Sequence, residues 1–111
     1  MTNDFYCDEV LSGKVDVTKI YETDNVLAYY HTRPFYEVHI VVIPKKHINS
    51  LISLMDDKDH ELLIELMEVV SQVSKKIIGE YGASRIVTNL GEYQESKHLH
   101  WHVAYGKKIR E

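Results

Sequence analysis

Three histidines alternate with apolar residues near the C-terminal end of the sequence, in the run His98-Leu99-His100-Trp101-His102-Val103. Successive side chains of an extended strand point to opposite faces, so this spacing places the three imidazoles on one face. The apolar side chains then share the other face, which we expect to be buried in the core. Such a group of imidazoles points to an active site, because a neutral imidazole near pH 7 is a competent nucleophile, proton carrier or metal ligand.

The strand spacing bears on which of these uses applies. In a strand, the Cα atoms of His98 and His102 lie about 13 Å apart, whereas each ligand of a zinc ion sits about 2 Å from the metal. All three histidines therefore do not easily chelate one ion, although two of them could do so with ligands from elsewhere. A central histidine with a histidine on each side better suits a nucleophile or an acid–base residue. An edge strand with a solvated histidine face is the structural alternative.

Other polar side chains could complete such a site. His39 begins an apolar run and His47 follows two lysines, and each taken alone is more often structural. Asn89 ends a predicted strand, where its amide could either donate to a phosphate or sugar hydroxyl or cap a turn. The loop that carries Gln94 and Ser96 leads directly to the histidine run, so its N–H groups and hydroxyl could line an anion pocket beside the central histidine.

The composition is that of one ordinary globular domain, which we expect to span residues 1–111. A net charge of −4 without a long basic tract argues against a surface that coats nucleic acid. No segment approaches the roughly eighteen apolar residues of a membrane span. The single cysteine, Cys7, excludes an intramolecular disulfide framework and suits a reducing compartment. We therefore expect a soluble cytoplasmic protein that contacts neither nucleic acid nor membrane.

The pattern of apolar residues predicts an α+β fold in which one long helix covers a sheet. Leucines, valines and isoleucines recur at three- and four-residue steps over 57–80, which predicts an amphipathic helix capped by Asp56 or Asp57. A short helix is expected over 5–11. Strands are expected over 19–21, 26–30, 38–43, 85–90 and 98–105. One helix cannot cover a wide sheet, so an edge or face is open to burial by dimerisation.

Two motifs in register give the sequence a specific resemblance to a known family. The segment from His98 to Ala104 matches the alternating His-φ-His-φ-His-φ-φ signature of the histidine triad (HIT) superfamily, where φ is apolar. Upstream, His39-Ile-Val-Val-Ile-Pro-Lys-Lys-His47-Ile is similar to the H-x-x-V-I-P-K-x-H-I segment of its nucleotide-binding Hint branch. The resemblance covers nearly the whole chain and implies the HIT-like fold, with a five-stranded antiparallel sheet.

The resemblance also implies a function. It indicates a homodimer with joined sheets and an enzyme that cleaves a nucleoside monophosphate from a leaving group, as a phosphoramidate hydrolase does. His100 would attack the phosphorus and become transiently nucleotidylated, and His102 would hydrogen-bond the phosphate. His98 and His39 would complete the histidine cluster, and Asn89 would contact ribose or phosphate. That scheme requires no metal or other cofactor. A regulatory module that binds nucleotides with little turnover, and a metal-dependent hydrolase that uses two of the three histidines, are the alternatives.

The sequence departs from the family pattern at three places. Glu95 stands where a hydroxyl residue is expected before the triad, with Ser96 one place later, and His31 matches an acidic residue that holds the ribose. Many bacterial relatives bind a structural zinc ion through an N-terminal Cys-x-x-Cys and two histidines. The matching positions suggest an altered zinc site, formed by Asp4, Cys7, His47 and His98.

Overall fold

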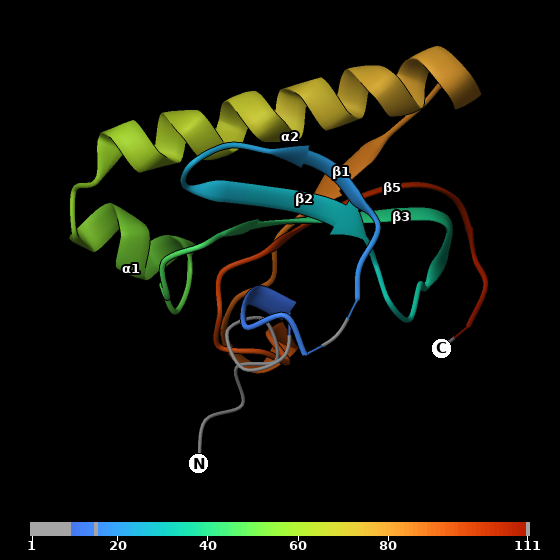
Figure 1. The fold of residues 1–111 in the computed structure, drawn as a ribbon. Helices are drawn as coiled ribbons and strands as arrows, with labels where there is room; N and C mark the ends of the chain where they lie inside the picture. Colours follow the sequence, from blue (N-terminus) through green and yellow to red (C-terminus); the bar gives the residue numbers. More distant parts are fainter. Residues whose placement is uncertain (1–9, 15, 111) are drawn as a thin grey trace.

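The protein forms one five-stranded antiparallel sheet with one long helix against one face, as a computed structural model describes for residues 10–14 and 16–110 (Figure 1). The strand order in the sheet is β1-β2-β3-β5-β4. The strands are β1 (Lys19–Glu22), β2 (Val26–Tyr30), β3 (Tyr36–Pro44), β4 (Arg85–Val87) and β5 (Trp101–Lys108). The helices are α1 (Leu51–Asp56), α2 (His60–Tyr81) and the 3-10 turn η2 (Gly91–Tyr93). This confirms the predicted fold class, while residues 5–9 of the expected N-terminal helix lie outside the described residues.

The middle strand, β3, packs against a core on each of its faces. Ile40 and Val42 belong to the cluster beneath α2, whereas Val41 and Ile43 belong to a second cluster on the opposite face. A strand buried on both sides is apolar almost throughout, which explains its continuous run of β-branched residues. The apolar partners of the histidine run, Leu99, Trp101 and Val103, are buried in the cluster beneath α2. The prediction that their face forms the core is therefore confirmed, and the face away from α2 is left for the imidazoles.

The helical region differs from the single helix that was predicted over 57–80. A short helix, α1, begins after Ser50, whose hydroxyl accepts a hydrogen bond from the Ser53 N–H. The helical backbone is interrupted at Lys58, which has a left-handed φ of 58°. The next helix, α2, then starts with Asp59 as its N-cap instead of Asp56 or Asp57. The short helix α1 was not predicted, and the predicted helix begins three residues earlier than α2 does. Within the described residues, no helix is long and apolar enough to cross a membrane.

Two strand boundaries differ from the prediction in a way that shapes the site. β4 ends at Val87 and not at residue 90, and β5 begins at Trp101 and not at residue 98. The Thr88 hydroxyl donates to the His100 carbonyl at 2.8 Å. This side-chain hydrogen bond joins the two segments where the backbone hydrogen bonds between β4 and β5 end. His98 and His100 therefore lie in the segment that leads into β5, and His102 alone of the three lies within the strand.

Candidate active site

A pocket of about 660 Å³ opens on the face of the sheet away from α2. It is lined by His31 and its neighbours after β2, by His39 of β3, by the loop after β4 and by the start of β5. Six of the predicted site residues line it: His31, His39, Asn89, Ser96, His100 and His102. The pocket thus brings together side chains that lie far apart in the sequence.

The tautomer of His100 is set by the residue two places before it. Its Nδ1 lies 2.7 Å from the carbonyl oxygen of His98. A carbonyl can only accept, so Nδ1 carries the proton and Nε2 of the neutral ring carries the lone pair. The side chain is 6% exposed, which holds the ring in place between the pocket and the core. His100 is therefore held as a base or nucleophile that acts through Nε2.

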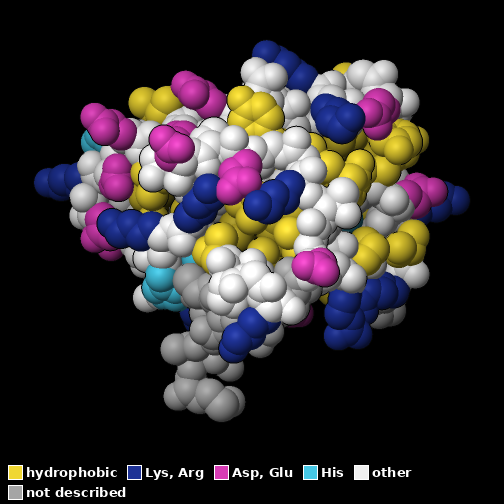
Figure 2. All heavy atoms as spheres, viewed as in Figure 1, with side chains coloured by type: hydrophobic (Ala, Val, Ile, Leu, Met, Phe, Trp, Pro, Cys, Tyr) yellow, Lys and Arg dark blue, Asp and Glu magenta, His cyan; other side chains and the backbone are white. Residues whose placement is uncertain are grey.

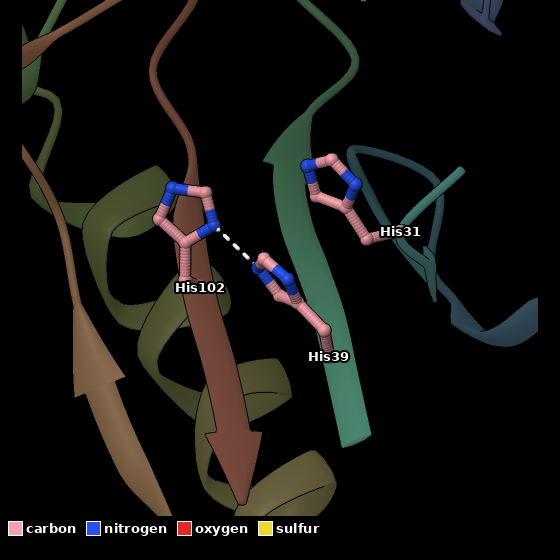
Figure 3. A group of neighbouring side chains, drawn as sticks. All are labelled: His31, His39 and His102. Atoms are coloured by element: carbon pink, nitrogen blue, oxygen red, sulfur yellow. Dashed lines mark hydrogen bonds between the residues drawn. The ribbon is translucent and has the colours of Figure 1, made fainter. Parts of the chain in front are cut away.

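His39 and His102 form a hydrogen-bonded pair across the central strands (Figure 3). The register pairs His102 with Val41 and Ala104 with His39, so the two imidazoles are diagonal neighbours on one face. The Phe35 N–H donates to Nδ1 of His39 at 3.0 Å, and Nε2 of His39 lies 2.8 Å from Nδ1 of His102. Neutral His39 must then donate from Nε2, and neutral His102 keeps its proton on its own Nε2. This relay makes His102 a hydrogen-bond donor.

His31 extends the histidine cluster beyond His39 and His102. Its ring stacks on that of His39 with centroids 4.3 Å apart, and it lies 6.1 Å from that of His102. Nδ1 of His31 accepts a hydrogen bond from the Arg33 N–H at 3.0 Å. The other ring nitrogen of the neutral side chain is therefore also a donor. Figure 3 shows the three rings close together, with His39 on β3, His102 on β5 and His31 just after β2.

These three histidines are close enough to be tested as a metal site. One nitrogen of each, taken from His31, His39 and His102, lies within 4.8 Å of the others. A metal binds a ring nitrogen through its lone pair, yet the Phe35 and Arg33 N–H groups already use Nδ1 of His39 and His31. Nε2 of both rings carries the proton in the neutral form. The hydrogen bonds therefore fit a cluster of donors better than a set of metal ligands.

The four pocket histidines are neutral at pH 7. Burial, reinforced by neighbouring histidines and arginines, lowers the pKa of His39 to about 3 and that of His31 to about 4. Burial and the adjacent histidines also lower the pKa of His102 to about 4. The pKa of His100 is lowered by burial too, against the opposing effect of its bond to the His98 carbonyl. The neutral ring of His100 thus carries a lone pair on Nε2.

Two predicted site residues lie outside the pocket lining. His98 is fully buried, and its Nε2 donates to the Pro44 carbonyl at 2.8 Å, so it supports the site through its own carbonyl and not through its ring. Gln94 is 6% exposed, and its amide donates to the Asn49 carbonyl instead of facing the pocket. Both positions follow from the late start of β5, which leaves the preceding segment folded against the residues after β3.

Sequence reasoning missed one side of the pocket, which Arg33, Phe35 and Arg110 form. The Arg110 guanidinium donates to the carbonyls of Pro34 and Arg33, and its Cζ lies 4.1 Å from the centre of the Phe35 ring. Seventy-seven residues separate the partners of the second hydrogen bond, so no local pattern could have joined them. The turn-forming Thr32-Arg33-Pro34 was a signal for a strand break but carried no hint of a binding role.

Comparisons with known proteins show the family to which this fold belongs. The HIT domain family matches residues 12–109. An uncharacterized HIT-like protein of Borreliella burgdorferi is 36% identical over 86% of this chain and 70% of its own length. A HIT family hydrolase from Clostridium thermocellum has a TM-score of 0.80 and 25% identity, over 100% of this chain and 96% of that one. A hypothetical histidine triad nucleotide-binding protein from Sulfolobus tokodaii has a TM-score of 0.80 and 28% identity, over 91% and 67%. With the family match extending over most of its length, this chain belongs to the HIT domain family.

Proposed function

We propose that the protein cleaves the bond between a nucleoside monophosphate and its leaving group, through a nucleotidyl intermediate on His100. The observation that carries this proposal is the tautomer of His100, which puts a lone pair on Nε2 in a pocket with several N–H donors. The similar structures named as a hydrolase and as a nucleotide-binding protein support the class of reaction. We place the reaction in the cytoplasm, the reducing compartment that a single cysteine suits.

The proposed reaction has two displacement steps at phosphorus. In the first, Nε2 of His100 forms a bond to the phosphorus of a nucleoside phosphoramidate and the bond to the amine breaks, with the amine taking up a proton from solvent as it leaves. In the second, water attacks the same phosphorus and gives up a proton to solvent, the bond to Nε2 of His100 breaks and the nucleoside monophosphate is released. The His98 carbonyl accepts from Nδ1 throughout and stabilises the positive charge on the substituted ring.

The other pocket residues act on the phosphoryl oxygens and the nucleoside. His102 donates from Nε2 to an oxygen that gains negative charge as the phosphorus is attacked, and its bond from His39 keeps that proton in place. Asn89 and Ser96 also line the pocket, and their amide and hydroxyl suit the phosphate or the leaving group. We expect purine nucleotides to be accepted, with the base in contact with Tyr29, which lines the pocket.

Turnover of an adenosine phosphoramidate that carries a fluorogenic amine tests this function directly. The wild-type protein is expected to release the amine with many turnovers per chain, and to retain that rate after exhaustive chelation, since no step uses a metal. Activity that is lost on chelation and restored by zinc would favour the metal-dependent alternative. Tight binding of the nucleotide without release of the amine would favour a regulatory module.

The zinc site formed by Asp4, Cys7, His47 and His98 stays a prediction. The rings of His47 and His98 are edge-to-face neighbours with centroids 5.4 Å apart, whereas Asp4 and Cys7 lie outside the described residues. An ion at this place would tie the N-terminal segment to the sheet and would add stability without entering the reaction. Elemental analysis is expected to find zinc in the purified protein and less in Cys7→Ser, with the His60→Ala protein as the matched control.

We also propose a homodimer that is joined along the edge strand β4. Among the residues that the structure describes, this strand pairs with β5 alone, and Ile86 and Val87 are 50% and 36% exposed on it. Leu90 and Tyr93 add exposed apolar surface just beyond its end. An open, apolar strand edge is a ready site for pairing with a second copy.

Light scattering tests the dimer. The wild-type protein is expected at twice the chain mass, and Ile86→Arg is expected to shift it toward the monomer because a charge enters the shared surface. The matched control is Ile52→Arg on α1, where the side chain is 57% exposed and the substitution should leave the mass unchanged. A monomeric wild-type protein, or equal effects of the two substitutions, would contradict the proposal.

A further inference from the structure

The two ends of the pocket differ in charge. Glu95 lines the pocket together with His100, and its negative charge opposes the lowering of the His100 pKa by burial. Around His31, burial and His100 lower the pKa of the ring most, and the charges of Arg110 and Arg33 lower it further. Lys108 adds a third cation to the lining. In a chain whose net charge is −4, this end concentrates positive charge, and Figure 2 shows Lys and Arg side chains gathered beside the C-terminal end of the chain.

The guanidinium of Arg110 is held in position by two hydrogen bonds and a ring contact. Nε of Arg110 donates to the Pro34 carbonyl at 3.1 Å and Nη2 donates to the Arg33 carbonyl at 2.6 Å. The guanidinium also stacks over the Phe35 ring, which itself lies 5.8 Å from that of His31. Across the described ranges 10–14 and 16–110, every ion pair joins a lysine to a glutamate, and the lysines are Lys19, Lys45 and Lys76. Neither Arg33 nor Arg110 therefore has an acidic partner there.

The neutral ring of His31 is also a hydrogen-bond donor at this end of the pocket. Nδ1 of His31 is taken by the Arg33 N–H, which leaves a ring N–H as its remaining polar group. The carbonyls of Arg33 and Pro34 are taken by Arg110. This end of the pocket therefore offers several N–H donors and two positive charges, and a group with many acceptor oxygens satisfies them better than a hydroxyl does.

We propose that His31, Arg33 and Arg110 form a second anion subsite, and that the substrates are conjugates of nucleoside bisphosphates with one phosphate on a ribose hydroxyl. This inference rests on the proposed function, which places the reacting phosphate against His100 and His102. The rings of His102 and His31 are 6.1 Å apart, a separation on the scale of the single ribose that joins the phosphates of a nucleoside 3′,5′-bisphosphate. The two phosphates then contact donors at opposite ends of the histidine cluster.

Calorimetric titration of the whole protein with three ligands tests the subsite. Adenosine 3′,5′-bisphosphate is expected to bind roughly tenfold more tightly than AMP, the order of one charge-assisted contact. ADP carries its second phosphate on the 5′ phosphate instead of on the 3′ hydroxyl and controls for the number of phosphates, so we expect the bisphosphate to be preferred over ADP as well. The preference should weaken as salt is added, because the two arginines are near the surface.

The double variant Arg33→Gln/Arg110→Gln is expected to bring the ratio of the bisphosphate and AMP dissociation constants close to one. Arg85→Gln removes an arginine outside this pocket and should keep the wild-type ratio, with thermal unfolding used to check that each variant is folded. Equal binding of AMP and the bisphosphate by the wild-type protein would overturn the subsite and leave the proposed function standing. An unchanged ratio in the double variant would overturn the assignment of these residues, and binding of no nucleotide would overturn both proposals.

Discussion

Replacing His100 with alanine is expected to lower phosphoramidate turnover by more than about a thousandfold, the scale of losing a nucleophile. The ring supplies the lone pair on Nε2, and no other described histidine has its Nδ1 proton held by the backbone two residues before it. Nucleotide affinity should fall far less, because the N–H donors of His102 and the arginines remain. Steady-state kinetics with the fluorogenic amine, together with nucleotide titration, measures both quantities.

His60→Ala is the matched control for this substitution. His60 is an exposed residue in the first turn of α2, on the far side of the sheet from the pocket, so its loss should leave the rate unchanged. A His100→Ala protein that is folded and turns over within tenfold of the wild type would contradict the assignment of the nucleophile.

Replacing His39 with phenylalanine is expected to lower kcat by about a hundredfold, a typical contribution of one positioned proton donor or acceptor. Phenylalanine fills the same buried space but donates no hydrogen bond to Nδ1 of His102. The proton of His102 can then move from Nε2 to Nδ1, and Nε2 becomes an acceptor. KM should change little, because the lost interaction strengthens only as charge develops on the phosphoryl oxygen.

A conservative variant separates this positioning role from a structural one. His39→Gln retains an N–H that can reach His102, and we expect it to recover about a tenth or more of the wild-type kcat. Equal impairment of the phenylalanine and glutamine variants, or a loss confined to KM, would show that His39 serves packing and not the relay. Thermal unfolding of both variants accounts for any change in stability.

Much of the fold could be predicted because strong local patterns agreed with it. The continuous β-branched run of β3 reflects burial on two faces, and the alternation of His with Leu99, Trp101 and Val103 reflects one buried face. The short helix α1 was not predicted, because its six residues are too few to show a helical period. The late start of β5 was missed because an extended segment and a strand show the same alternation.

The site was predictable where one strand carries it and hidden where distant segments meet. Alternation alone singled out His100 and His102, whereas the role of the His98 carbonyl depends on the turn of the backbone before β5. The contact of His39 with His102 depends on the β3–β5 register, which no local pattern specifies. Arg110 reaches the pocket by packing on Phe35 across the sheet, and charge counting along the sequence gave no sign of it.

The stereochemical course at phosphorus tests the central claim, a nucleotidyl intermediate on a histidine, most directly. Each displacement inverts the configuration, so a substrate made chiral at phosphorus with sulfur and an oxygen isotope reports whether there are one or two steps. Two displacements through His100 predict a product with retained configuration. An inverted product would mean that water attacks the substrate directly, and it would contradict the role that the tautomer of His100 assigns to this residue.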